Sequence, residues 1–109
     1  MRDDAPLIVL TTVETQEDGT GIARLLVEER LAACVNIVPG VQSVYWWEGR
    51  VNVEGEMLLL IKTTATMVDA LQARLAEIHP YDLPEFVVLE PERLSPRYRE
   101  WIIDSVRPS

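Results

Sequence analysis

The return strand of a long hairpin reads Glu56-Met57-Leu58-Leu59-Leu60-Ile61-Lys62-Thr63. Side chains of a β-strand point alternately to opposite faces, so a strand with one face in water alternates apolar and polar residues. The run from Met57 to Ile61 does not alternate, which predicts that both faces of this strand are covered. A chain of 109 residues can supply helices for one face. Another copy of the same chain is the simplest cover for the other.

Periodicity and turn residues on either side of this hairpin predict the remaining elements. The expected strands are 7–10, 33–47 with a bend at Pro39-Gly40, 51–63 and 85–89, and the expected helices begin at Thr15, Thr66 and Ser95. Right-handed crossovers place the first two helices on the same side of the sheet. This order predicts an α+β, ferredoxin-like fold, a split βαβ sandwich with an antiparallel sheet and an extra C-terminal helix, in a single domain of residues 1–109.

The sheet face opposite the helices has no predicted cover. The apolar side chains expected to meet water there are drawn from Val35, Ile37, Tyr45, Trp47, Leu58 and Leu60. Burying about five of them contributes on the order of 8–15 kcal/mol per chain as an upper bound. Because that is comparable with the stability of a whole small domain, we predict an obligate oligomer with its sheets facing inward. Partial cover by the C-terminal helix is the alternative.

Composition narrows the location and the partners. The start, Met1-Arg2-Asp3-Asp4, is polar and acidic, unlike a secretory signal, and one cysteine cannot form an internal disulfide, so we expect a cytoplasmic protein. No apolar run approaches the roughly 18 residues of a membrane span. The formal net charge of −8 repels phosphate backbones and anionic lipid surfaces. Nucleic acid and membrane are therefore not expected partners.

Several different motifs follow one another along the chain, and they are specific in combination. They read Leu31-Ala32-Ala33-Cys34-Val35-Asn36-Ile37-Val38-Pro39-Gly40, Ser43-Val44-Tyr45-Trp46-Trp47-Glu48-Gly49 with Glu56, Ile61-Lys62-Thr63-Thr64, His79-Pro80-Tyr81 with Pro84-Glu85, and Tyr98-Arg99-Glu100-Trp101-Ile102. Together they resemble the CutA family, the divalent-cation tolerance proteins, from Ile8 to about Val106. The resemblance implies a compact homotrimer and a link to copper and other divalent cations, and no catalytic activity is securely attached to the family. That trimer resembles the PII signalling proteins, which bind small effectors between subunits.

Cys34, His79 and Glu85 are the candidate metal ligands. A thiolate suits soft metals such as Cu(I) or Zn(II), although a lone cysteine on an apolar strand is also a common core residue. Some family members carry two further cysteines, and the matching positions here are Thr11 and Arg74. His79, the only histidine, either binds metal or caps the second helix, and Glu85 lies within reach of it by the sequence. One Cys and one His cannot close a four-ligand zinc site, so symmetry copies or carboxylates must assist.

Lys62, Tyr81 and Glu56 are the candidate ligand-binding residues. Lys62 is the only lysine and ends an apolar run, so we expect it either to emerge at the strand end or to pair with an acid such as Glu56 or Glu85. The functional alternative is an anion-binding lysine in a cleft between subunits. The aromatic side chains Tyr45, Trp47, Tyr81 and Trp101 either pack or stack on such a ligand.

The sequence has no P-loop, no Gly-x-Ser-x-Gly and no His-Glu-x-x-His, and nothing marks Cys34 as an activated nucleophile. We therefore predict a non-enzymatic, copper-tolerance homotrimer that binds copper or another divalent metal weakly and has no other cofactor. The alternative is a PII-like sensor or scaffold that binds an anionic ligand between subunits. A purely structural assembly protein is a third reading.

Overall fold

The computed structural model describes residues 4–107, so Met1 to Asp3, on which part of the leader prediction rests, lie outside it. Its elements are β1 (Pro6–Val13), α1 (Gln16–Glu28), β2 (Cys34–Trp47), β3 (Arg50–Thr64), the 3₁₀ turn η1 (Ala65–Met67), α2 (Val68–Ile78), β4 (Val87–Leu89) and α3 (Pro96–Val106). The four-stranded sheet has the order β2-β3-β1-β4, with antiparallel neighbours. This is the predicted ferredoxin-like arrangement.

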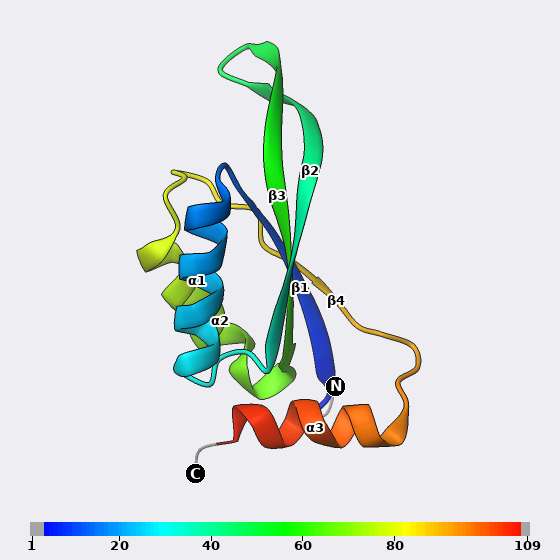
Figure 1. The fold of residues 1–109 in the computed structure, drawn as a ribbon. Helices are drawn as coiled ribbons and strands as arrows, with labels where there is room; N and C mark the ends of the chain where they lie inside the picture. Colours follow the sequence, from blue (N-terminus) through cyan, green and yellow to red (C-terminus); the bar gives the residue numbers. More distant parts are fainter. Residues whose placement is uncertain (1–3, 108–109) are drawn as a thin grey trace.

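The two main helices cover one face of the sheet. In Figure 1, α1 and α2 lie side by side on that face, α3 crosses one end of the sheet, and the β2–β3 hairpin extends beyond the body. The helix side of β3 presents Leu59 and Ile61, both fully buried against Leu26 and Leu71. Their neighbours on the opposite side of the strand, such as Leu60, are only half-buried. One face of the apolar strand is therefore covered within the chain.

The predicted bend in β2 is a β-bulge. The pairing of β2 with β3 shifts register between Val38 and Val41, and Gly40 adopts a φ of 78°, a left-handed conformation that glycine tolerates without strain. Because side chains alternate along a strand, the shift moves the residues beyond it to the other face. The side chains of β2 therefore alternate between the two sheet faces in opposite phase before and after the bulge.

This division corrects the expected set of uncovered residues. Val35 and Ile37 pair with Ile61 and Leu59, share their helix-facing side, and pack against the core. The prediction that they face the uncovered side was wrong, because the phase of alternation cannot be continued through a bulge. Beyond the bulge, large apolar side chains are exposed. They are Val44, Tyr45, Trp46, Trp47, Val51 and Val53.

The hairpin closes as predicted at Glu48-Gly49. Both residues have positive φ, 51° and 79°, as a two-residue turn of the type that matches strand twist requires. The turn is followed by a strand that continues without interruption to Thr64. Trp46, next to the hairpin end, is 74% exposed. The chain therefore projects a stiff, apolar ribbon away from its own core.

α3 covers only one end of the sheet. Ile102 and Val106 form a small buried cluster with Ala33, and Arg30 Nη1 donates to the carbonyl of Ser105 at 2.9 Å. The β4 side chains, 87–89, all remain exposed. β4 is also shorter than predicted, since the structure assigns no strand to Glu85 and Phe86. The C-terminal helix is therefore a partial cover.

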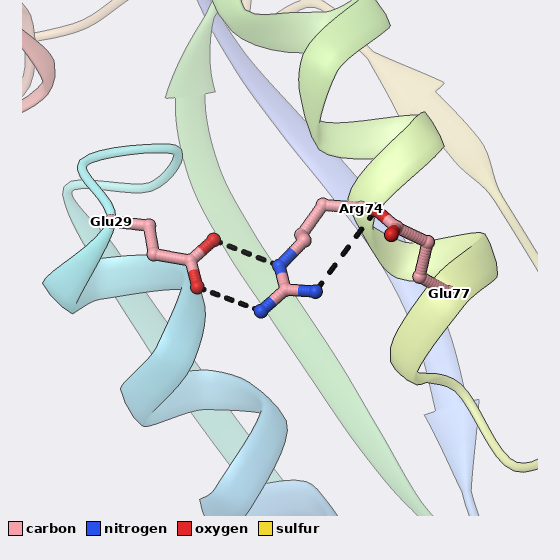
Figure 2. A network of polar contacts seen from close by, with 3 residues as sticks. All are labelled: Glu29, Arg74 and Glu77. Carbon is pink, nitrogen blue, oxygen red and sulfur yellow. Dashed lines mark hydrogen bonds and ion pairs between the residues drawn. The ribbon is translucent and has the colours of Figure 1, made fainter.

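A polar clamp joins α1 to α2 (Figure 2). Arg74 donates from Nε and Nη2 to the two carboxylate oxygens of Glu29, each at 2.9 Å, and its Nη1 lies 4.0 Å from Glu77. The hydrogen bond from Arg74 lowers the pKa of Glu29 below its usual value. This bidentate geometry suits arginine rather than lysine. The position that carries a cysteine in some family members thus serves helix packing here.

Two buried threonines on the helix side of the sheet provide a matched test. Within residues 4–107, Thr11 Oγ1 has no hydrogen-bond partner, whereas Thr63 Oγ1 donates to the Leu31 carbonyl at 2.7 Å. Thr11→Val removes an unsatisfied hydroxyl and is expected to raise the free energy of unfolding by about 1 kcal/mol. Thr63→Val leaves the Leu31 carbonyl without this donor and is expected to lower the free energy of unfolding by ~1–3 kcal/mol. Urea denaturation measures both, and a loss in Thr11→Val equal to that in Thr63→Val would contradict the assignment.

Candidate functional site

The six candidate site residues fall into separate places on the fold. Glu56, His79 and Tyr81 meet at one end of the sheet. Lys62 lies six residues further along β3 than Glu56, about 20 Å at the usual strand rise, and pairs in register with Cys34. Glu85 stands in the segment between α2 and β4. Within one chain, the residues predicted to share a site are therefore split between the middle of β3 and its C-terminal end.

His79 ties the end of α2 to β1. Its Nε2 lies 2.8 Å from the carbonyl oxygen of Thr12, and its Nδ1 accepts from the backbone N–H of Tyr81 at 3.1 Å. A carbonyl can only accept, so Nε2 carries the proton and the ring is the neutral tautomer with Nδ1 as acceptor. Both ring nitrogens are engaged, and a metal ion bound by His79 has to displace one of these bonds.

His79 caps α2 with its backbone and not with its side chain. His79 is the C-cap residue of α2, and its backbone N–H bonds to the Leu75 carbonyl. The imidazole itself turns away from the helix end to β1, beyond the last β1–β4 pair at Leu10 and Val87. There it satisfies a carbonyl that β4 is too short to reach. The sequence places a histidine at a helix end, but no residue pattern near His79 predicts that its ring bonds to the Thr12 carbonyl on β1.

Tyr81 and Glu56 form a short polar pair. The Tyr81 hydroxyl donates to Glu56 Oε2 at 2.6 Å, a charge-assisted length, and Glu56 is buried. The Tyr81 ring also lies 4.8 Å from that of His79. Burial, followed by the bond to Glu56, raises the pKa of Tyr81 well above its usual range. The hydroxyl therefore stays a proton donor at neutral pH, and Tyr81 links Glu56 to His79 in one hydrogen-bonded chain.

Lys62 has an aromatic partner in place of the expected acid. Its Nζ donates to the Tyr98 hydroxyl at 3.2 Å and lies 5.5 Å from the centroid of that ring. Tyr98 in turn stacks on Trp101, with centroids 5.5 Å apart and an interplanar angle of 25°. Across residues 4–107, no ion pair joins Lys62 to a carboxylate. The predicted pairing with Glu56 or Glu85 is thus replaced by a contact with α3.

Sequence reasoning did not connect Lys62 with Tyr98. The available signal was the spacing of Tyr98 and Trp101, which places them on one helix face. That spacing does not say which strand the face meets. Only the crossing of α3 over the end of the sheet brings the pair to Lys62.

Within residues 4–107, Cys34 and Glu85 belong to no metal cluster. Cys34 is a half-buried free thiol, and its Sγ lies 3.8 Å from Asn36 Oδ1. Glu85 is exposed. In the described part of the chain, no group of three or more His, Cys, Asp or Glu side chains is placed to hold a metal ion. A site that uses Cys34, His79 and Glu85 stays a prediction and requires more than one subunit.

The fold and these motifs have clear counterparts among known proteins. The CutA1 divalent ion tolerance protein family matches residues 7–105. The chain belongs to this family. A divalent-cation tolerance protein CutA of Thermus thermophilus is 47% identical over 95 residues, which cover 87% of this chain and 92% of that protein. The solved structure of CutA from Synechococcus elongatus has a TM-score of 0.91 and 41% identity, and the match covers 98% of this chain and 95% of that one.

Other CutA relatives are longer. The chloroplastic CutA 1 of rice is 45% identical over 103 residues, which cover 94% of this chain but 58% of the rice protein. The chloroplastic CutA of Arabidopsis thaliana matches over 56% of its own length. This chain therefore spans little more than half of these plant CutA proteins.

The Tyr81–Glu56 bond makes a spectroscopic prediction. Because the folded pKa of Tyr81 is raised, any stability that the bond contributes is present below the usual tyrosine pKa of about 10 and is lost as the pH rises through the folded value. In an alkaline absorbance titration, Tyr81→Phe should remove a late-ionising phenol. Glu56→Gln should lower the pH at which that phenol ionises, since the nearby negative charge is removed. An unchanged titration in both variants would contradict the pairing.

Proposed function

We propose that this CutA protein contributes to divalent-cation tolerance as a non-enzymatic homotrimer that binds metal weakly, with copper preferred. Membership of the CutA1 family over residues 7–105 carries the proposal. We also propose that the protein is cytoplasmic, although the names of some relatives assign them to the chloroplast or periplasm. The described residues contain no helix with both the length and the apolar character that a membrane crossing requires.

Exposed apolar surface supports the assembly. The cross-strand pair Val44 and Val53 is 63% and 58% exposed on the hairpin, and all of β4 is exposed on the opposite edge of the sheet. Exposed apolar side chains grouped on each edge of the sheet are typical of protein–protein interfaces rather than of free surface. Removal of these side chains from water is a strong driving force for association, since each contributes about 1.5–3 kcal/mol before association costs.

The metal part of the proposal centres on Cys34. Its thiol is the only cysteine sulfur of the chain, and it is half-buried rather than sealed in the core. Glu85 is exposed and available to a neighbouring subunit. His79 contributes only if it releases Thr12 or Tyr81. Such a shared, partly preoccupied ligand set is consistent with weak binding.

The assembly is tested at the hairpin. Val53→Asp places a charge on the proposed interface and is expected to reduce the mass in light scattering from three times 12.4 kDa toward that of one chain. Gln72→Asp, on the exposed side of α2, is the matched control and should leave the mass unchanged. A stable wild-type monomer, or a Val53→Asp protein of unchanged mass, would refute this interface.

The metal site is tested by Cu(I) competition under reducing conditions. Cys34→Ser should weaken binding at least about tenfold, equivalent to ~1.4 kcal/mol, because the soft donor is lost. Glu85→Gln and His79→Ala should have smaller effects, and Asp82→Asn, in the same loop, serves as the charge control. Undiminished copper affinity in Cys34→Ser would remove the ligand assignment without affecting the test of assembly.

A further inference from the structure

We infer that the hydrogen bond from Tyr81 to Glu56 is a latch that fixes the direction of the projecting β2–β3 hairpin, and that the hairpin pivots at its base when this bond is absent. We name residues 41–56 the distal hairpin. It begins at the first β2–β3 pair beyond the bulge, Val41 and Glu56, and extends away from the body (Figure 1). The pairing of β3 with β1 stops at Met57, so the distal hairpin is a ribbon of only two strands.

The backbone at the base of the distal hairpin is weakly constrained. Pro39 has no N–H to donate to the strand pairing, and Gly40 lies within the register shift. On the facing strand, Gly55 contributes no side chain, and a Cβ at this position would meet no other atom within 4 Å. A two-stranded hairpin is only marginally stable by itself. Its direction relative to the body therefore depends on a contact from outside the ribbon.

One side-chain bond provides this contact. Glu56 is the only buried residue of the distal hairpin, and its Oε2 accepts the Tyr81 hydroxyl at 2.6 Å. Among residues 4–107, no other side-chain hydrogen bond or ion pair joins the distal hairpin to the rest of the chain. A charge-assisted bond is about twice as strong as a neutral one. Placed at the base of the ribbon, it restrains the direction of every residue beyond it.

The Tyr81 side of the latch is anchored to the body. The Tyr81 backbone N–H donates to His79 Nδ1 at 3.1 Å, and His79 Nε2 donates to the Thr12 carbonyl at 2.8 Å. Pro80 and Pro84 flank Tyr81 in the sequence and restrict the backbone of this segment. The latch therefore ties the direction of the distal hairpin to the positions of α2 and β1. The inference depends neither on metal binding nor on a particular oligomer.

The experiment measures backbone amide NMR relaxation and relaxation dispersion on the protein in its native oligomeric state, because together these cover fast and slow motion. In the wild type, the distal hairpin is expected to be as rigid as β1, with order parameters of about 0.85. Tyr81→Phe and Glu56→Leu each remove the bond and should lower these values toward about 0.6, or add relaxation dispersion, in the distal hairpin alone. Tyr98→Phe removes a hydroxyl that bonds to Lys62, further along β3, and is the matched control. It should leave the distal hairpin rigid.

A second substitution tests the pivot itself. Gly55→Val adds a β-branched side chain where there is open space and stiffens the strand. In the Tyr81→Phe chain it should restore rigidity to the distal hairpin.

Neighbouring subunits are a second possible restraint, so the comparison is repeated in the Val53→Asp chain. Light scattering on the same samples reports assembly separately, and the latch is judged from relaxation alone. Unchanged mobility of the distal hairpin in Tyr81→Phe and Glu56→Leu, in both backgrounds, overturns the inference. Loosening that extends equally to β1 and α1 also overturns it, because that result indicates general destabilisation. If Glu56→Leu does not fold, Tyr81→Phe decides.

Discussion

The two unequal faces of β3 set the constraint on which the rest of the structure depends. Leu59 and Ile61 project into the core beneath α1 and α2, while the side chains between them project to a face that no main helix covers. A ferredoxin-like chain has only two crossover helices, and both right-handed connections lead to the same side. The remaining apolar surface is thus a consequence of topology rather than of an unusual composition.

The bulge in β2 decides which part of that surface belongs to the chain's own core. Before the shift at Val38/Val41, Val35 and Ile37 complete the helix-side packing. After it, the hairpin leaves the body (Figure 1), and its exposed side chains are aromatic and branched apolar residues. A two-residue turn with two positive φ values closes this ribbon, and the pairing of β2 with β3 continues up to it. The same strand pair therefore serves as core at one end and as free apolar surface at the other.

The polar residues form two separate groups. At one end of the sheet, Glu56, Tyr81 and His79 satisfy each other and the backbone. At the other, Lys62 Nζ donates to the Tyr98 hydroxyl of α3, and Cys34 Sγ lies 3.8 Å from Asn36 Oδ1. The two groups connect different elements: His79 and Tyr81 tie the end of α2 to β1 and β3, whereas Lys62 ties β3 to α3.

Local patterns were sufficient for the elements and their order. The Thr15 cap bonds to the Asp18 N–H as expected, the Glu48-Gly49 turn and the Pro39-Gly40 bulge lie where the residues indicated, and Pro96 begins α3. Each of these signals acts within a few residues, so it can be read without knowledge of the fold. The family motifs extended that prediction to the whole domain.

Tertiary structure alone decided the partners of the functional side chains. His79 bonds to a strand 67 residues away, and Lys62 meets Tyr98 from 36 residues further along the chain. A spacing pattern contains no information about such pairs, because they depend on the twist of the sheet and on where α3 crosses it. Sequence thus specified which residues carry charge, sulfur or aromatic rings. The packing of distant elements specified which of them is satisfied and which is left open.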